Sequence, residues 1–277
     1  MIPKKIHWCW LSGDPLPDNI QKCLDSWSKC LPDYTVKCWT AENFDVHSVL
    51  YVEEAYKQRK WAFCADYIRA YALYNEGGIY LDSDVMVLKS FDVFLQYGFF
   101  SAVEYIPDNV ECFKVNERFL NSDGTRKINV PYVHGIGIQA AIMGSVKGHP
   151  YIKACLEYYQ KLHFQMNKGY DNMAIIAPNI YALNAESFGF KYKNEDQRLG
   201  KDMMIYKDEV FCIPEFVNQR TYAVHLVAHS WYSPTFFQKV YSKLAQCKFL
   251  KRIFDILEKN KCSRFVIAAI KKTVWLK

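Results

Sequence analysis

The chain has 277 residues, of which 51% are hydrophobic and 16% aromatic. This composition supplies enough apolar surface for a large core and excludes an intrinsically disordered chain. No apolar run reaches the roughly eighteen residues of a membrane-spanning helix, and the opening MIPKKIHWCW lacks the long apolar stretch of a secretion signal. We therefore expect a cytoplasmic protein.

The net charge of +6 is unevenly distributed. From Lys239 onward, eleven Lys and Arg residues stand against Asp255 and Glu258, which leaves 24 basic and 27 acidic residues in the rest of the chain. A slightly acidic main domain argues against nucleic-acid binding, which needs a basic surface on the folded body.

The ten cysteines are scattered, and none forms a C-x-x-C pair. Several lie inside apolar runs such as WAFCADY. Zinc sites need closely spaced ligand pairs and disulfides need an oxidising compartment, so we expect reduced, mostly buried thiols.

Strand and helix patterns alternate over the first hundred residues. Apolar periodicity and turn residues predict the following elements in chain order: a strand over 6–10, a helix over 18–30, a strand over 35–39, a short helix over 41–49, a long helix over 60–75, a strand over 79–81 and a strand over 99–104. Such alternation indicates an α/β domain with a mostly parallel central sheet.

The second half of the chain gives weaker signals. Residues 105–131 are polar and irregular, and we expect a loop region with little regular structure there. A helix is expected from the GHP turn at 148–150 to Tyr159, and a strand over 222–228.

Two carboxylates directly follow the buried strand in the stretch GGIYLDSDV. Residues two apart on a strand share a face, so Asp82 and Asp84 converge while Ser83 points away. Two close negative charges favour a cation between them, and hard oxygen ligands suit Mg²⁺ or Mn²⁺ bound to phosphates. The other interpretation is a solvated strand end, because a bare D-x-D is common.

The preceding helix places Asp66 and Arg69 three residues apart on one face. An ordinary intrahelical ion pair would explain them. On a largely apolar helix, however, buried charges are costly unless they have partners or a function.

The block ADYIRAYALYNEGGIYLDSDV resembles the DXD-containing sugar-binding region of glycosyltransferase family 32, and is similar to the catalytic domain of large clostridial glucosylating toxins. IPKKIHWCWLSG resembles the family's first strand, GIQAAIMGSVKGHP its middle segment and HLVAHSW its closing H-x-x-x-x-S-W element. The resemblance spans roughly residues 2–232 and is most specific at the D-x-D block.

The resemblance implies a GT-A fold, a Rossmann-like single domain over 1–235, and retaining transfer from a UDP- or GDP-sugar with Mn²⁺ or Mg²⁺. The acceptor would be a glycan or lipid-linked glycan of a capsule, O-antigen or related surface polysaccharide. The implied catalytic residues are Asp66, Arg69, Asp82 and Asp84. The implied donor contacts are Trp10, Asp66, Arg69, Tyr80, Asp82, Ser230 and Trp231.

A further metal ligand could come from His225 or His229. On a strand these two residues lie about 13 Å apart, so one ion cannot take both. The family pattern favours His225, whereas His229 stands where such sequences often have Gly. His134, His149 and His163 lack a partner motif, and we read them, with His7, as structural or surface residues.

Residues 236–277 carry apolar residues at three- and four-residue intervals between lysines. This pattern is typical of a basic amphipathic helix lying on an anionic membrane, and also of helices that pack on the domain with Lys outside. A peripheral contact with the inner face of the cytoplasmic membrane is therefore one of two expectations.

Two other functions use the same motif. A haloacid-dehalogenase-like phosphatase also ends a strand in D-x-D, with the first Asp as nucleophile. Such enzymes usually have Thr or Val where this chain has Met86, and carry the pair near the N-terminus. A non-catalytic nucleotide-sugar-binding protein is the third interpretation.

Overall fold

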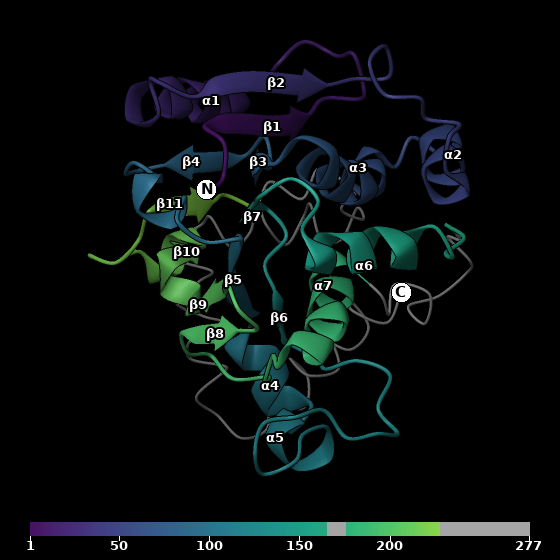
Figure 1. Cartoon of the computed structure of the whole chain (residues 1–277), viewed down its shortest axis with the longest axis vertical. Helices are drawn as coiled ribbons and strands as arrows, with labels where there is room; N and C mark the ends of the chain where they lie inside the picture. The colour runs from purple at the N-terminus through teal and green to yellow at the C-terminus, as the bar shows by residue number, and fades with distance from the viewer. Residues whose placement is uncertain (165–175, 228–277) are drawn as a thin grey trace, which may run out of the picture. The chain divides into compact units, whose positions relative to one another are not determined.

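The computed structural model describes residues 1–164 and 176–227, and all of these lie in one compact unit (Figure 1). The expected tail over 236–277 and the domain boundary at 235 lie outside the described residues.

The centre of this unit is a sheet of order β2-β1-β3-β7-β5-β9-β8, with β6 paired to β5. The bounds of its strands are β1 Lys5–Cys9, β2 Thr35–Trp39, β3 Gly78–Leu81, β5 Phe99–Tyr105, β6 Ile136–Ile138, β7 Ile142–Ser145, β8 Gln197–Leu199 and β9 Met203–Tyr206. Strands β2, β1, β3, β5 and β9 run in one direction, and β6, β7 and β8 run against them. The predicted α/β class with a mostly parallel central sheet is confirmed.

A second, small sheet has the order β10-β11-β4. Its strands are β4 Val85–Val87, β10 Phe211–Cys212 and β11 Ala223–His225. Because β4 follows β3 after only three residues, the D-x-D motif is the direct connection between the two sheets. The predicted strand over 222–228 is thus present as the shorter β11.

The helices are α1 Asp18–Cys30, α2 Leu50–Lys57, α3 Trp61–Glu76, α4 Pro107–Cys112, α5 Val115–Arg118, α6 Pro150–Tyr159 and α7 Ala177–Ala185. Helix α3 packs against α2 and α6, and α6 against α7, which groups these four helices together (Figure 1). Helix α1 instead contacts β4 of the small sheet.

The side chains of β3 alternate between two cores. Tyr80 belongs to the core shared with α3, α6 and α7. Ile79 and Leu81 belong to the core shared with α1 and the small sheet. All four residues of β3 are buried, as a central strand covered on both faces requires.

Two sequence predictions of secondary structure are wrong. The short helix expected over 41–49 is a series of turns, because the side chains of Thr40, Asn43 and Asp45 bond nearby backbone groups and compete with helix formation. Helix α2 begins only at Leu50.

The second error concerns 105–131, which contains the helices α4 and α5. Pro107 occupies the first turn of α4, where its fixed φ favours helix initiation. The region is therefore partly ordered into helices rather than a loop alone.

No helix within 1–164 and 176–227 is long and apolar enough to cross a bilayer. The eight cysteines in these ranges are free thiols, and four of them are buried: Cys23, Cys64, Cys155 and Cys212.

The glycine pair after α3 lets the chain turn directly into β3. Gly77 ends the helix, with its N–H donating to the Leu73 carbonyl, and has φ 68°. Gly78 has φ 114°, and a Cβ there would lie 2.6 Å from the Lys5 carbonyl oxygen in β1. The close β1–β3 pairing that sets the position of Asp82 therefore requires glycine at 78.

We expect Gly78→Ala to lower the free energy of unfolding by about 2–4 kcal/mol, because backbone strain adds to a backbone collision. Gly189→Ala is the matched control, since Gly189 also has positive φ (100°) but no atom within 4 Å of its Cβ position. Gly189→Ala should lower the free energy of unfolding by only about 1 kcal/mol. Urea unfolding measures both, and equal losses would contradict the steric argument.

Candidate functional site

The predicted site residues gather at the carboxyl edge of the central sheet. Trp10 follows β1, and Asp82 follows β3. Glu104 is the penultimate residue of β5, which is parallel to β3. Ligands of open α/β sheets bind at this edge.

Three side chains form a group with metal-ligand geometry. One ligand atom each from Asp82, Asp84 and His225 lies within 4.8 Å of the other two. The Nε2 atom of His225 is 3.3 Å from Oδ1 of Asp84. The backbone builds this proximity, because His225 pairs with Val85 across β11 and β4, and the Leu226 N–H donates to the Asp84 carbonyl.

The group fits a divalent cation. Ligand atoms about 2.1 Å from one octahedral ion lie about 3.0 Å apart when adjacent and about 4.2 Å apart when opposite. The separations among Asp82, Asp84 and His225 are of this size, so small side-chain movements bring all three to one ion. Two carboxylates and an imidazole are also chemically suitable ligands for such a metal.

Asp82 is held from its other side by α3. The Nη2 atom of Arg69 lies 2.8 Å from Oδ1 of Asp66 and 3.3 Å from Oδ1 of Asp82. The Tyr80 hydroxyl donates to the same Asp82 oxygen at 2.9 Å. The Arg69 guanidinium also lies 4.8 Å from the centre of the Tyr80 ring. The sequence-predicted pair on α3 is thus linked directly to the D-x-D motif.

Arg69 and Tyr80 are 4% and 1% exposed, and in this structure Arg69 pairs with Asp66 and Asp82 while the Tyr80 hydroxyl bonds Asp82. Their donor contacts stay predictions. Asp66 is less enclosed, with 13% of its side chain exposed.

Burial and neighbouring charges shift the pKa values of two groups at this site. Burial raises the pKa of Asp66 to about 7; Arg69 opposes this change and Asp82 adds to it. Burial disfavours the charged form of His225, but Asp84, Asp82 and Glu104 outweigh it and raise the pKa of the imidazole. Acidic side chains on more than one side of His225 therefore favour its positively charged form.

Glu104 is a site residue that the sequence interpretation missed. Burial raises the pKa of its carboxyl to about 7, and His225 pulls it back. The signal was available, because the predicted strand over 99–104 ends in an acidic residue at the same sheet edge as Asp82. Nothing in the sequence alone showed that β11 would bring His225 near it.

Trp10 is half-buried at the end of β1, and its indole Nε1 donates to the Asp14 carbonyl. Its ring centre lies 6.3 Å from that of Trp8. The other predicted closing residues, His229, Ser230 and Trp231, lie outside the described residues.

The remaining histidines have structural partners. His7 bonds Gly77 and Trp39, His149 accepts from the Tyr151 N–H at the start of α6, His134 stacks on Phe113, and His163 pairs with Glu54. These contacts agree with the structural role expected for them.

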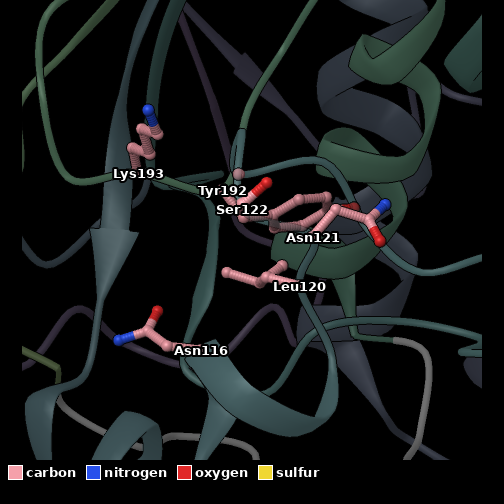
Figure 2. A pocket seen from close by; sticks show the side chains of 7 residues that line it. Asn116, Leu120, Asn121, Ser122, Tyr192 and Lys193 are labelled. Carbon is pink, nitrogen blue, oxygen red and sulfur yellow. The ribbon is translucent and has the colours of Figure 1, made fainter.

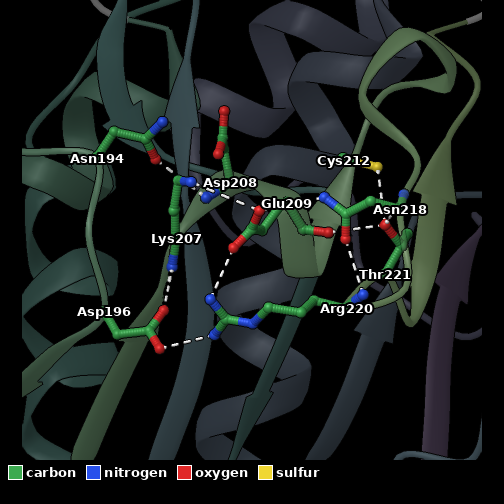
Figure 3. A network of polar contacts seen from close by, with 9 residues as sticks. All are labelled: Asn194, Asp196, Lys207, Asp208, Glu209, Cys212, Asn218, Arg220 and Thr221. Atoms are coloured by element: carbon green, nitrogen blue, oxygen red, sulfur yellow. Dashed lines mark hydrogen bonds and ion pairs between the residues drawn. The ribbon is translucent and has the colours of Figure 1, made fainter.

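A polar network fixes the loop that leads into β11 (Figure 3). Arg220 bonds Glu209 at 2.6 Å and Asp196 at 2.8 Å. The Thr221 hydroxyl donates to the Glu209 carbonyl and accepts from the Asn218 N–H. These bonds hold the start of β11 in place and so help to fix the pairing of β11 with β4 that positions His225.

Val227, just beyond β11, has φ 50°. Positive φ is strained for a β-branched residue, and such strain concentrates near ligand sites. It supports placing the candidate site at this end of β11.

A separate pocket of about 230 Å³ lies near α5 (Figure 2). It is lined by Asn116, Leu120, Asn121, Ser122, Gly124, Tyr192 and Lys193. None of these residues belongs to the carboxylate group, so the sheet edge, and not this pocket, is the candidate site.

Comparison with known families also points to the carboxyl edge of the central sheet as the candidate site. Residues 17–100, which include α3, β3 and the D-x-D motif, match the family described as glycosyltransferase sugar-binding region containing DXD motif. The match ends at residue 100, two residues into β5, so Glu104 and His225 lie outside the matched region.

A protein of Acanthamoeba polyphaga mimivirus described as uncharacterized glycosyltransferase L373 is 32% identical over 108 residues. The match covers 36% of this chain and 42% of that relative, less than half of either protein.

Two solved glycosyltransferase structures are also similar. PaToxG glycosyltransferase gives a TM-score of 0.46 at 18% identity, covering 67% of this chain and 69% of that one. The galactosyltransferase LgtC, in complex with donor and acceptor sugar analogues, gives a TM-score of 0.40 at 12% identity, covering 87% and 95%.

The raised pKa of Glu104 predicts a pH-dependent stability difference. Between its usual value of 4.5 and about 7, the unfolded chain ionises Glu104 while the folded metal-free protein keeps it protonated. Stability contributed by this group is therefore present at low pH and lost as pH rises to about 7. Relative to Glu104→Gln, the wild type should lose on the order of 1–3 kcal/mol of unfolding free energy across this window.

Urea unfolding in a metal chelator at about pH 5 and pH 8 measures this difference. Glu111→Gln, which removes an exposed carboxylate on α4, controls for the loss of one charge. Parallel pH curves for the wild type and Glu104→Gln would disprove the burial effect.

Proposed function

We propose that this chain is a metal-dependent, retaining glycosyltransferase that moves a hexose from a nucleotide-sugar to a glycan. The observation that carries the proposal is the convergence of Asp82, Asp84 and His225, with ligand atoms within 4.8 Å of one another, inside and beside a DXD sugar-binding region. Such a group suits an ion that binds a diphosphate.

The chain's own residues prepare this site before any ligand arrives. Arg69 and Tyr80 hold one oxygen of Asp82, which leaves the second oxygen for a ligand. His225 reaches Asp84 from β11. The two carboxylates are thus oriented from opposite faces of the central sheet, which limits the rearrangement that binding requires.

A bound divalent metal would act as a Lewis acid that neutralises charge on the departing nucleoside diphosphate. We propose Mn²⁺ over Mg²⁺, because an imidazole nitrogen is a softer ligand than the oxygen atoms that Mg²⁺ prefers.

We propose that Trp10, which follows β1 and is half-buried, stacks on the nucleobase of a UDP- or GDP-sugar. Aromatic rings bind the flat faces of bases well. We propose that Asp66, whose side chain is 13% exposed, bonds a hydroxyl group of the ribose or the donor sugar.

Retention and the biological role rest on the family resemblance. We propose a same-face attack by the acceptor hydroxyl, and an acceptor that belongs to a capsule, O-antigen or related surface glycan. A cytoplasmic enzyme held at the membrane by the basic segment 236–277 would suit a lipid-linked acceptor.

The phosphatase interpretation is weaker. Its nucleophile would be Asp82, yet one oxygen of Asp82 is already bonded by Arg69 and Tyr80. The DXD family match over residues 17–100 also favours sugar binding.

Metal-dependent donor binding tests the proposal. One nucleotide-sugar of a UDP and GDP panel should raise the melting temperature by about 5 °C at a hundredfold excess over its dissociation constant, only when Mn²⁺ or Mg²⁺ is present. Asp84→Asn should abolish this stabilisation, because it removes one negative ligand.

Asp25→Asn, on the exposed face of α1, should behave as the wild type. If no nucleotide-sugar stabilises the protein with any divalent ion, the enzyme proposal fails. Stabilisation that survives Asp84→Asn would place the metal elsewhere.

The raised pKa of His225 predicts that metal affinity depends on pH. A protonated imidazole cannot ligate, so the proton must leave before the ion binds. Mn²⁺ affinity, measured by electron paramagnetic resonance, should rise from about pH 6 to pH 8 in the wild type. His225→Gln should bind Mn²⁺ more weakly and lose most of this dependence; an unchanged pH profile would rule out His225 as a ligand.

A further inference from the structure

Glu104 shares a sheet face with the residues that lead to His225. Along β5, Phe100 and Ala102 pack into the core that also holds Val85 and Ala223 of the small sheet. Glu104 lies two residues beyond Ala102, and His225 two residues beyond Ala223. Since residues two apart on a strand share a face, both side chains extend from this common core toward the same edge.

The Glu104 carboxylate interacts electrostatically with His225 but has no hydrogen-bond or ion-pair partner within 1–164 and 176–227. Neither a hydrogen bond nor an ion pair engages it, although the residue is half-buried and near the charge of His225. The half-buried carboxylates Asp66 and Asp82, by contrast, share Arg69. A half-buried carboxylate without a partner is costly, and this cost is offset when a ligand supplies the missing hydrogen bond.

The missing partner is not the metal. Glu104 is not part of the group of ligand atoms that Asp82, Asp84 and His225 form within 4.8 Å. It therefore stands beside the metal group rather than in it, and faces whatever is bound next to that group.

The order of strands indicates what that ligand is. Along the sheet edge, Trp10 follows β1, the D-x-D motif follows β3, and Glu104 is the penultimate residue of β5, on the far side of β7. With the base at Trp10 and the diphosphate at the D-x-D motif, as proposed above, the transferred sugar and the incoming hydroxyl lie toward β5.

We propose that Glu104 binds the acceptor, by accepting a hydrogen bond from the hydroxyl group that attacks the donor sugar. This inference rests on the proposed function. It adds an acceptor-binding residue from outside the DXD family region, and it assigns the β5 end of the sheet edge to the acceptor.

Water and glycerol serve as acceptor probes, since both present a hydroxyl group and neither requires knowledge of the natural acceptor. Release of nucleoside diphosphate from UDP-glucose and GDP-mannose is measured with Mn²⁺ for wild type, Glu104→Gln, Glu104→Asp and the exposed control Glu111→Gln. Mn²⁺ and donor binding, and the melting temperature, are measured on the same proteins.

Glu104→Gln should lower turnover to water and glycerol by at least about tenfold and raise the KM for glycerol, with Mn²⁺ and donor affinity within about twofold of wild type. Glu104→Asp should recover part of the loss, and Glu111→Gln should match the wild type.

Turnover unchanged in Glu104→Gln would overturn the inference, and a parallel loss of Mn²⁺ affinity would reassign Glu104 to the metal. A wild-type chain that binds no nucleotide-sugar would instead overturn the proposed function. A wild type that binds donor with metal but shows an acceptor KM insensitive to residue 104 would overturn this inference alone.

Discussion

The structure depends on keeping two like charges close together. Asp82 and Asp84 are separated only by Ser83 at the end of a buried strand, where their mutual repulsion is poorly screened. Arg69 balances Asp82 from α3, and His225 balances Asp84 from β11. Each compensating group comes from a different layer of the fold, so the site exists only when both layers are assembled.

This constraint explains features that otherwise look unrelated. Gly78 brings β3 so close to β1 that a methyl group would collide with Lys5. Tyr80 is buried, yet its hydroxyl ends on Asp82. Arg220 and its partners hold the loop before β11. Each feature fixes the position of one member of the charged group, and together they make the group pre-organised.

The sequence predicted the N-terminal half of the fold well, because its signals are local. The long helix ending at Gly77 and the apolar strand before Asp82 follow from periodicity and glycine placement. The turns at Thr40–Asp45 were missed because side chains there replace helical hydrogen bonds. The short strands β6 to β10 give too few residues for a periodic signal.

The part of the site that lies in one continuous stretch of the chain could also be predicted from the sequence. Asp66, Arg69, Asp82 and Asp84 lie within one continuous block, so spacing alone groups them. Glu104 and His225 come from strands 121 positions apart, and their proximity is a property of tertiary packing. A single sequence carries no local record of such a pairing, which is why the role proposed for Glu104 could be inferred only from the assembled fold.

The three-residue link between β3 and β4 joins the two sheets of the fold. The chain passes here from the large sheet to the small one. An ion bound by Asp82, Asp84 and His225 would therefore cross-link the two sheets at this connection. A shift of one sheet against the other would separate the three ligands, and loss of the ion would remove this cross-link. Binding of the proposed ion would thus also stabilise the connection between the two sheets.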